Sequence, residues 1–337
     1  LYSLMLSSVA TGTILTMASS HWLLAWIGLE LNTLAIIPII SKQHHPRATE
    51  ATTKYFLTQA AASATILFAS TVNAWYTGTW DISQLTNPWA SILLTLALAM
   101  KLGLAPLHFW LPEVLQGTSM KTALIIATWQ KLAPMSLLFL THNSINFNTL
   151  LMMGIISTLT GGWGGLNQTQ TRKILAFSSI AHLGWMASIT TLNPNLMLLN
   201  LALYILMTTP LFLMVVFSSS KTIKDLTMSW TISPPITALM LTLLMSMGGL
   251  PPLTGFMPKW LIIQELTTHH LITPATVLAL SALLSLFFYL RLSYVSTLTI
   301  FPTTTKTSLK WRFQPKLNTT IMTTTTIASI LLLPSTP

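Results

Sequence analysis

The sequence predicts an all-α, polytopic membrane protein of about eleven transmembrane helices, organised as two inverted five-helix repeats that each contain a Gly/Pro-broken helix. Asp, Glu, Lys and Arg make up 7% of the 337 residues, against about 25% in a typical soluble domain. The mean hydropathy is +0.67. Apolar runs long enough to span a bilayer, which takes about 20 residues in a helix, follow one another along the whole chain.

We expect spans over the following apolar runs: 1–18, 21–41, 54–76, 90–111, 119–141, 146–166, 171–190, 195–218, 235–267, 272–296 and 318–334. The ninth run is too long for one straight span. It contains Gly248, Gly249, Pro251 and Pro252, which predicts a single broken helix because proline interrupts the backbone hydrogen-bond ladder.

The basic residues in the loops and at the loop ends of the predicted spans all belong to even-numbered loops: Lys42, Arg47, Lys54, Lys121, Arg172, Lys173, Lys221, Lys224, Lys306, Lys310, Arg312 and Lys316. The odd-numbered loops contain no Lys or Arg. The positive-inside rule then places the N-terminus and the even loops inside, and the C-terminus outside. The net charge of +10 is therefore a topology signal, and we expect no nucleic-acid partner. No basic stretch precedes the first run, so no cleavable signal peptide is expected.

A short motif recurs in the fourth and ninth runs. Residues 102–113 read LGLAPLHFWLPE and residues 248–259 read GGLPPLTGFMPK, identical at five of twelve positions and 146 residues apart. Five intervening helix steps reverse the direction of the chain, which is typical of inverted repeats. We therefore predict a first repeat over 1–141, a second over 146–296, a basic inside loop over 297–317 and an additional helix over 318–337. The alternative is chance recurrence of Gly, Leu and Pro in membrane helices.

The charged residues Glu30, Lys101, Lys131 and Lys259 lie inside long apolar runs. A charge at the centre of a spanning helix costs about 2.5–3.5 kcal/mol, so such residues usually line an internal polar path. Each lysine lies beside a Gly or Pro residue that frees backbone carbonyls, which are tolerated only inside protein or beside a wet cavity. This coincidence indicates a hydrated internal axis. The alternative for Lys131 and Lys259 is snorkelling to an interface.

A buried lysine with a movable carboxylate partner can switch its protonation state. Glu30 is the candidate partner, but the sequence does not show which lysine it approaches. His182 lies inside the seventh run and suits a proton relay because histidine titrates near neutral pH, although it can also simply hydrogen-bond a neighbouring helix. Glu113 occupies the repeat position of Lys259, but it lies close to a loop and is expected to be interfacial.

The sequence also excludes some chemistry. It contains no cysteine, which rules out disulfides and Cys-ligated clusters in this chain. It has no G-x-G-x-x-G or H-E-x-x-H motif, and its paired loop histidines have the wrong spacing for a closed metal site. We expect neither a cofactor nor a metal in this chain.

Six segments together resemble the chain 2 family of NADH–ubiquinone oxidoreductase, the antiporter-like subunits of respiratory complex I, in its animal mitochondrial form. They are SSHWLLAWIGLELN (19–32), KYFLTQAAAS (54–63), MKLGLAPLHFWLPEVLQG (100–117), TWQKLAP (128–134), GGWGGLNQTQTRKILAFSSIAHLGWM (161–186) and GGLPPLTGFMPKW (248–260). The resemblance covers essentially the whole chain.

The resemblance implies that Glu30 and Lys101 form an acid–lysine pair, and that Lys131 and Lys259 continue a proton path with His182 as an intermediate. It implies proton translocation across the inner mitochondrial membrane, with the basic loops in the matrix and the C-terminus in the intermembrane space. NADH, FMN, iron–sulfur clusters and ubiquinone would bind other subunits. The partners would be other membrane-arm subunits, including antiporter-like chains, in a hetero-oligomer with lipid such as cardiolipin.

Two other functions fit parts of the sequence. A subunit of a multi-chain cation/proton antiporter would share the fold and the lysines, and would respond to sodium rather than NADH. A structural membrane scaffold would use its charges only to hold helices together. Neutral replacement of paired charges would then change assembly but not proton flux.

Overall fold

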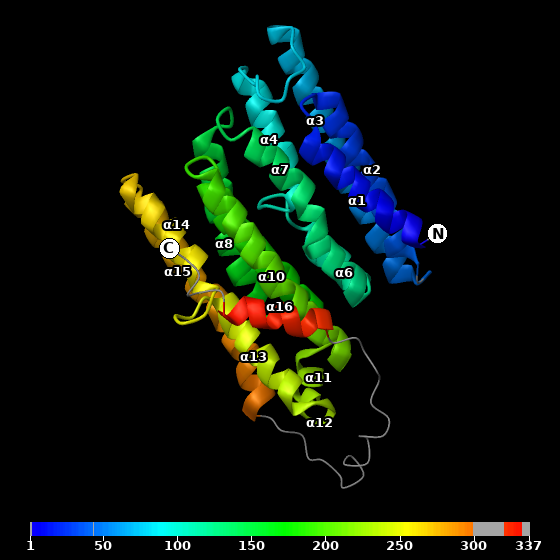
Figure 1. Cartoon of the computed structure of the whole chain (residues 1–337), viewed down its shortest axis with the longest axis vertical. Coiled ribbons are helices and arrows are strands. Elements are labelled where there is room, and N and C mark those ends of the chain that lie inside the picture. The colour runs from blue at the N-terminus through cyan, green and yellow to red at the C-terminus, as the bar shows by residue number, and fades with distance from the viewer. Residues whose placement is uncertain (1, 43, 299–319, 332–337) are drawn as a thin grey trace. The chain divides into compact units, whose positions relative to one another are not determined.

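The computed structural model describes residues 2–42, 44–298 and 320–331, and within them the chain forms sixteen α-helices, α1 to α16, and one 3-10 helix, η1 (Figure 1). Six helical segments are long and apolar enough to cross a membrane. The chain is thus an all-helical membrane protein, as predicted. Most of the predicted basic loop 297–317 lies outside the described residues.

The unbroken helices coincide with predicted apolar runs to within a few residues at most ends. They are α1 (Tyr2–Ala18), α2 (Trp22–Ser41), α3 (Pro46–Thr77), α8 (Phe147–Leu166), α9 (Thr171–Ile189), α10 (Pro194–Ser218), α15 (Ile272–Leu298) and α16 (Thr320–Leu331). The main difference is α3, which begins eight residues before its apolar run. Pro46 occupies its first turn and the His45 side chain accepts a hydrogen bond from the Arg47 amide, so the helix start is set by its cap rather than by hydropathy.

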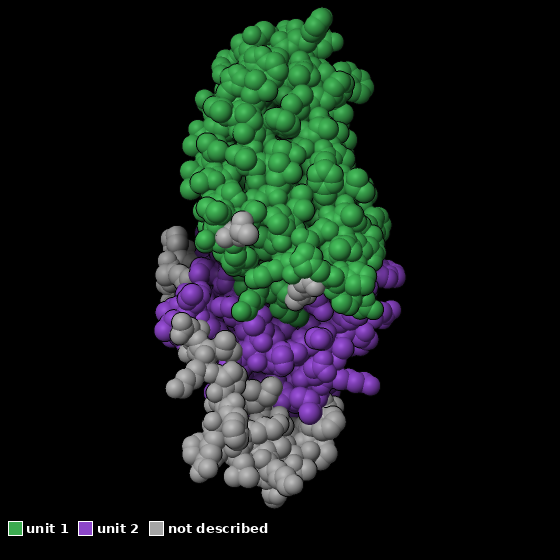
Figure 2. Space-filling view, turned by 90° about the vertical axis from the view of Figure 1, so that its right-hand side faces the viewer, with its two compact units in different colours: residues 1–161, 179–197 green, residues 162–178, 198–337 purple. Residues whose placement is uncertain are grey.

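The chain divides into two compact units, one of residues 1–161 and 179–197 and the other of residues 162–178 and 198–337 (Figure 2). In the first unit, α1 packs against α2, and α3 packs against both α2 and α4. Gly12 and Gly28 let α1 and α2 approach closely, because a Cβ atom on Gly12 would lie 2.9 Å from the carbonyl oxygen of Gly28. Small residues at such crossings are typical of membrane helix packing.

Two helices are broken in the same way. The first consists of α4 (Pro88–Leu102) and α5 (Trp110–Gly117), and the second of α13 (Pro234–Gly248) and α14 (Phe256–Thr268). Both α4 and α13 begin with proline, contain 15 residues and end at a left-handed glycine. Gly103 has φ 80° and ψ 39°, and Gly249 has φ 81° and ψ 40°. Positive φ favours glycine, which explains why the recurring sequence motif keeps this residue.

A second feature recurs outside the motif. The loop before α2 pairs with the loop after α3 through an isolated β-bridge between His21 and Asp81, and the loop before α9 pairs with the loop after α10 through one between Gln170 and Thr222. Each bridge is closed by two backbone hydrogen bonds of 3.0–3.2 Å. Two short helices, α11 (Ile223–Thr227) and α12 (Ser229–Ile232), then lead into α13.

The fifth predicted span is interrupted more gently. It consists of α6 (Met120–Ala127), η1 (Trp129–Lys131) and α7 (Leu132–Leu140). The interruption lies before Pro134, because this proline falls in the first turn of α7, where a missing backbone N–H is tolerated. Lys131 is therefore held in the 3-10 turn itself, whereas α15 shows no such interruption.

We expect Gly103→Ala to destabilise the protein by more than the roughly 1–2 kcal/mol that a left-handed backbone costs an L-residue. A Cβ there would lie 3.0 Å from Cδ1 of Leu111, so the first turns of α5 would have to shift. Gly78→Ala is the matched control, because Gly78 also has positive φ (73°) but open space around its Cβ position. Thermal inactivation of the assembled protein in its membrane measures the difference. Equal losses for the two variants would contradict the close packing at the break.

Candidate functional site

The three intramembrane lysines are all buried. Lys101 lies in the last turn of α4, Lys131 in η1 and Lys259 in α14, with 6%, 3% and 8% of their surfaces exposed. His182 is likewise buried in α9, and Glu30 lies near the middle of α2 with partial exposure. Exposure of this order leaves little room for snorkelling to water.

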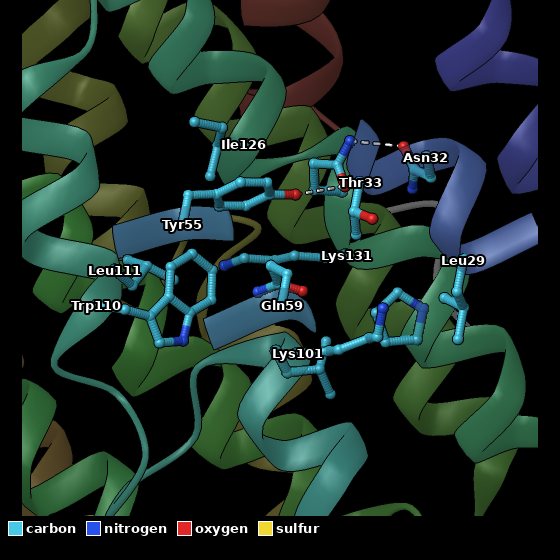
Figure 3. Close-up of a pocket in the computed structure, with 13 residues that line it drawn as sticks. Leu29, Asn32, Thr33, Tyr55, Gln59, Lys101, Trp110, Leu111, Ile126 and Lys131 are labelled. Atoms are coloured by element: carbon cyan, nitrogen blue, oxygen red, sulfur yellow. Dashed lines mark hydrogen bonds between the residues drawn. The ribbon is translucent and has the colours of Figure 1, made fainter. Parts of the chain in front are cut away.

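Lys101 and Lys131 line one cavity in the first unit (Figure 3). Its volume is about 10 Å³, close to what one water molecule needs. The lining residues come from α2, α3, the broken helix α4–α5 and the interrupted span α6–η1–α7. They are Leu29, Asn32, Thr33, Tyr55, Gln59, Lys101, Leu102, Trp110, Leu111, Ile126, Gln130, Lys131 and Pro134. The structure thus brings together two of the predicted lysines, while His182 does not line this cavity.

The polar side chains of the cavity form a connected set. The Gln130 amide donates to Oδ1 of Asn32 at 2.7 Å, and the Tyr55 hydroxyl donates to Oε1 of Gln130 at 3.4 Å. The Lys131 side chain extends across the cavity toward Trp110 (Figure 3). The Trp110 indole N–H donates to the carbonyl of Met100 at 3.0 Å, which satisfies one of the last carbonyls of α4.

Glu30 and Lys101 do not form an ion pair in this structure. Within the described part of the chain, ion pairs are recorded for Lys54, with Glu50 and Glu113. Buried Nζ of Lys101, Nε2 of Gln59 and Oε2 of Glu30 make no hydrogen bond to the described protein atoms. Buried polar atoms of this kind are satisfied by ordered water in native proteins, so these groups favour a hydrated arrangement.

Lys259 belongs to the second unit and has a different environment. Its Nζ donates to the carbonyl of Gly248 at 2.8 Å and to that of Met247 at 3.5 Å. α13 ends at Gly248, so both carbonyls are among the last of the helix and lack an intrahelical donor. The predicted association of a lysine with loosened backbone is therefore confirmed here as direct hydrogen bonding.

Several residues of this arrangement are not predicted from the sequence. Arg291 lies inside the tenth apolar run, and its guanidinium donates to the carbonyl of Leu166, the last residue of α8; a cation suits a helix C-terminus. Arg291 is the one charged residue in that run, so it could have been predicted from the sequence to have a polar partner inside the protein. Asn32, Tyr55, Gln59 and Gln130 carried no comparable signal because uncharged polar residues are common in membrane helices. Glu113 is exposed and binds Lys54 at 2.7 Å, in keeping with an interfacial position.

Comparison with known proteins gives consistent matches. Residues 19–285 match the family described as NADH:quinone oxidoreductase/Mrp antiporter, and residues 286–337 match NADH dehydrogenase subunit 2 C-terminus. NADH-ubiquinone oxidoreductase chain 2 of Salmo salar is 60% identical over 99% of this chain and 96% of its own length. The Xenopus laevis protein of the same name is 58% identical over 100% and 97%.

Solved structures agree with the sequence relatives. A chain of respiratory complex I from Thermus thermophilus superposes with a TM-score of 0.89 at 26% identity, covering 99% of this chain and 78% of that one. A chain of an Mrp complex from a Dietzia species gives 0.80 at 19% identity, covering 90% and 62%. The second likeness shows a shared fold only.

We expect Lys259→Met to destabilise the second broken helix by about 1–3 kcal/mol, because it leaves two buried carbonyls without a donor. Lys259→Arg, which keeps a donor, should lose less. Lys121→Met is the matched control, since Lys121 is exposed. The measurement is thermal inactivation in native membranes. A Lys259→Met protein as stable as the Lys121→Met protein would show that the ammonium does not stabilise the break.

Proposed function

The chain belongs to the family of NADH-ubiquinone oxidoreductase chain 2, and from this premise we propose how its charged residues move protons. Members of this family are membrane subunits of complex I, so the chain is an antiporter-like proton translocation module. The redox cofactors lie in other subunits of the complex. What the family does not specify is the part played by each residue of this chain.

We propose that the membrane domain has eleven spans arranged as two inverted repeats, 1–141 and 146–296, followed by a basic loop (297–317) and an added helix (318–337). The support is the recurrence of the broken helix at an offset of 146 residues, with matching left-handed glycines, and the recurrence of the loop-to-loop bridge. The N-terminus and basic loops then face the matrix and the C-terminus faces the intermembrane space.

In the proposed path, Glu30 and Lys101 act as an ion pair that opens and closes. Each opening or closing changes the tendency of Lys131 to hold a proton. A proton is then loaded or expelled near Lys259, with His182 as an intermediate. The single observation that carries the link from Lys101 to Lys131 is the cavity that both residues line. A Lys101 ammonium that is not hydrogen-bonded to the described protein atoms can respond to a carboxylate that approaches or withdraws.

The energies involved are compatible with pumping. Each proton moved outward works against about 2.3 kcal/mol per 100 mV of membrane potential. Two unit charges at about 4 Å interact by roughly 4 kcal/mol at an effective dielectric of 20. Closing or opening one such pair therefore changes the energy of a neighbouring charge by enough to drive a proton against the potential. Quinone reduction elsewhere in the complex would supply the initial perturbation.

We also propose partners for this chain from its membership of the family. Other membrane-arm subunits, including neighbouring antiporter-like chains, would continue the path on either side, and lipid such as cardiolipin would fill the contacts with the bilayer. The multi-chain antiporter shares the fold with this protein, but the relatives over the full length belong to NADH-ubiquinone oxidoreductase. The experiment below also tests whether the charges only hold the helices together, as in a structural membrane scaffold.

We expect Lys101→Met and Glu30→Gln each to lower the number of protons pumped per NADH oxidised, because either change removes one charge of the pair. The measurement is proton uptake by vesicles that contain the assembled complex, at matched rates of NADH oxidation. Lys173→Met, which removes a charge from the first turn of α9, is the control and should pump normally. Unchanged stoichiometry in both pair variants, with complete assembly, would favour the scaffold function over proton transfer.

A further inference from the structure

The amide of Gln130 joins three helical elements of the first unit at one point. It donates to Asn32 on α2 at 2.7 Å and accepts from Tyr55 on α3 at 3.4 Å, while its own backbone belongs to η1. Asn32 and Tyr55 are each 2% exposed, so these hydrogen bonds are shielded from bulk water. Figure 3 shows the chain of contacts above Lys131.

The position of this amide in the sequence links it to both ends of the proposed first step. Gln130 immediately precedes Lys131, and Asn32 follows Glu30 by two residues on α2. The Asn32–Gln130 hydrogen bond therefore ties the helix that carries the acid to the turn that carries the second lysine. A displacement of α2 would be transmitted to the Lys131 turn through this bond.

The backbone of η1 holds its own conformation only weakly. A 3-10 helix has poorer hydrogen-bond geometry than an α-helix and occurs in short pieces, often at hinges. The Lys131 amide bonds to the carbonyl of Thr128 at 3.3 Å, which is a long contact. The 2.7 Å hydrogen bond that Gln130 donates to Asn32 thus holds the turn in a way that this backbone contact does only weakly.

An amide does not exchange protons readily at neutral pH, because its N–H is not acidic and its oxygen is not basic in that range. Gln130 is thus suited to positioning and not to proton relay. We propose that the Asn32–Gln130–Tyr55 hydrogen bonds make Gln130 a positioning residue, which holds Lys131 in register with the helix that carries Glu30 and passes movement of that helix to Lys131. This inference rests on the proposed function of the two lysines.

A length-exchange experiment tests the bond directly. Gln130→Asn shortens one partner by a methylene and should break the contact, so that protons pumped per NADH fall toward the level of Lys101→Met. Combining it with Asn32→Gln returns the lost length from the other side and should restore pumping. Gln264→Asn, on an exposed position of α14, is the control for a glutamine shortening elsewhere.

A second variant separates positioning from packing. Replacing Asn32 and Gln130 together by Leu removes both partners of the 2.7 Å hydrogen bond at similar volume, which is often nearly neutral for stability. The same variant carries Tyr55→Phe, which removes the hydroxyl that would otherwise lose its acceptor. We expect the assembled double-Leu complex to oxidise NADH but to pump poorly. Normal pumping by Gln130→Asn or by the double-Leu variant, or failure of the length exchange to restore pumping, would overturn the inference provided that Lys101→Met pumps poorly. Normal pumping by Lys101→Met would overturn the proposed function and this inference with it.

Discussion

The architecture depends on one constraint: inside a bilayer, every backbone polar group and every charge must find its partner within the protein or in trapped water. The two broken helices meet this constraint in the last turn of their first half, with different groups and at different carbonyls. After α4, the Trp110 indole donates to a terminal carbonyl of the helix, while after α13 the Lys259 ammonium does so. The left-handed glycines that end both helices allow the chain to turn so that these donors can reach.

This difference determines what each lysine is available to do. At the first break an uncharged indole serves a carbonyl, and the Lys101 ammonium makes no hydrogen bond to the described protein atoms. At the second break the ammonium itself bonds to backbone. A proton taken from Lys259 would then weaken a structural contact, so its charge state and the conformation of the break are physically coupled.

The interrupted fifth span adds an asymmetry between the two halves of the chain. Lys131 lies in a 3-10 turn that Gln130 fastens to α2 and α3, whereas α15 is continuous over Ile272–Leu298. Buried polar contacts are costly when one partner is missing, so the turn and the helix that carries Glu30 favour a common arrangement. One half of the chain therefore contains a turn held by the side-chain hydrogen bond between Gln130 and Asn32. The other half contains a lysine that bonds to the backbone.

The sequence by itself determined the helical membrane class, the position of each apolar helix, the broken fourth and ninth spans, and the lysines beside them. These features depend on local properties: hydropathy, the geometry of proline and glycine, and the cost of a charge in lipid. Only the tertiary structure decided which side chains satisfy the freed carbonyls, that Lys101 and Lys131 share a cavity, and that Asn32, Tyr55 and Gln130 connect three elements. The hydrogen bonds of Gln130 with Tyr55 and Asn32 join residues 75 and 98 positions apart. The sequence does not indicate such partners, because many uncharged polar side chains bond only to their own helix.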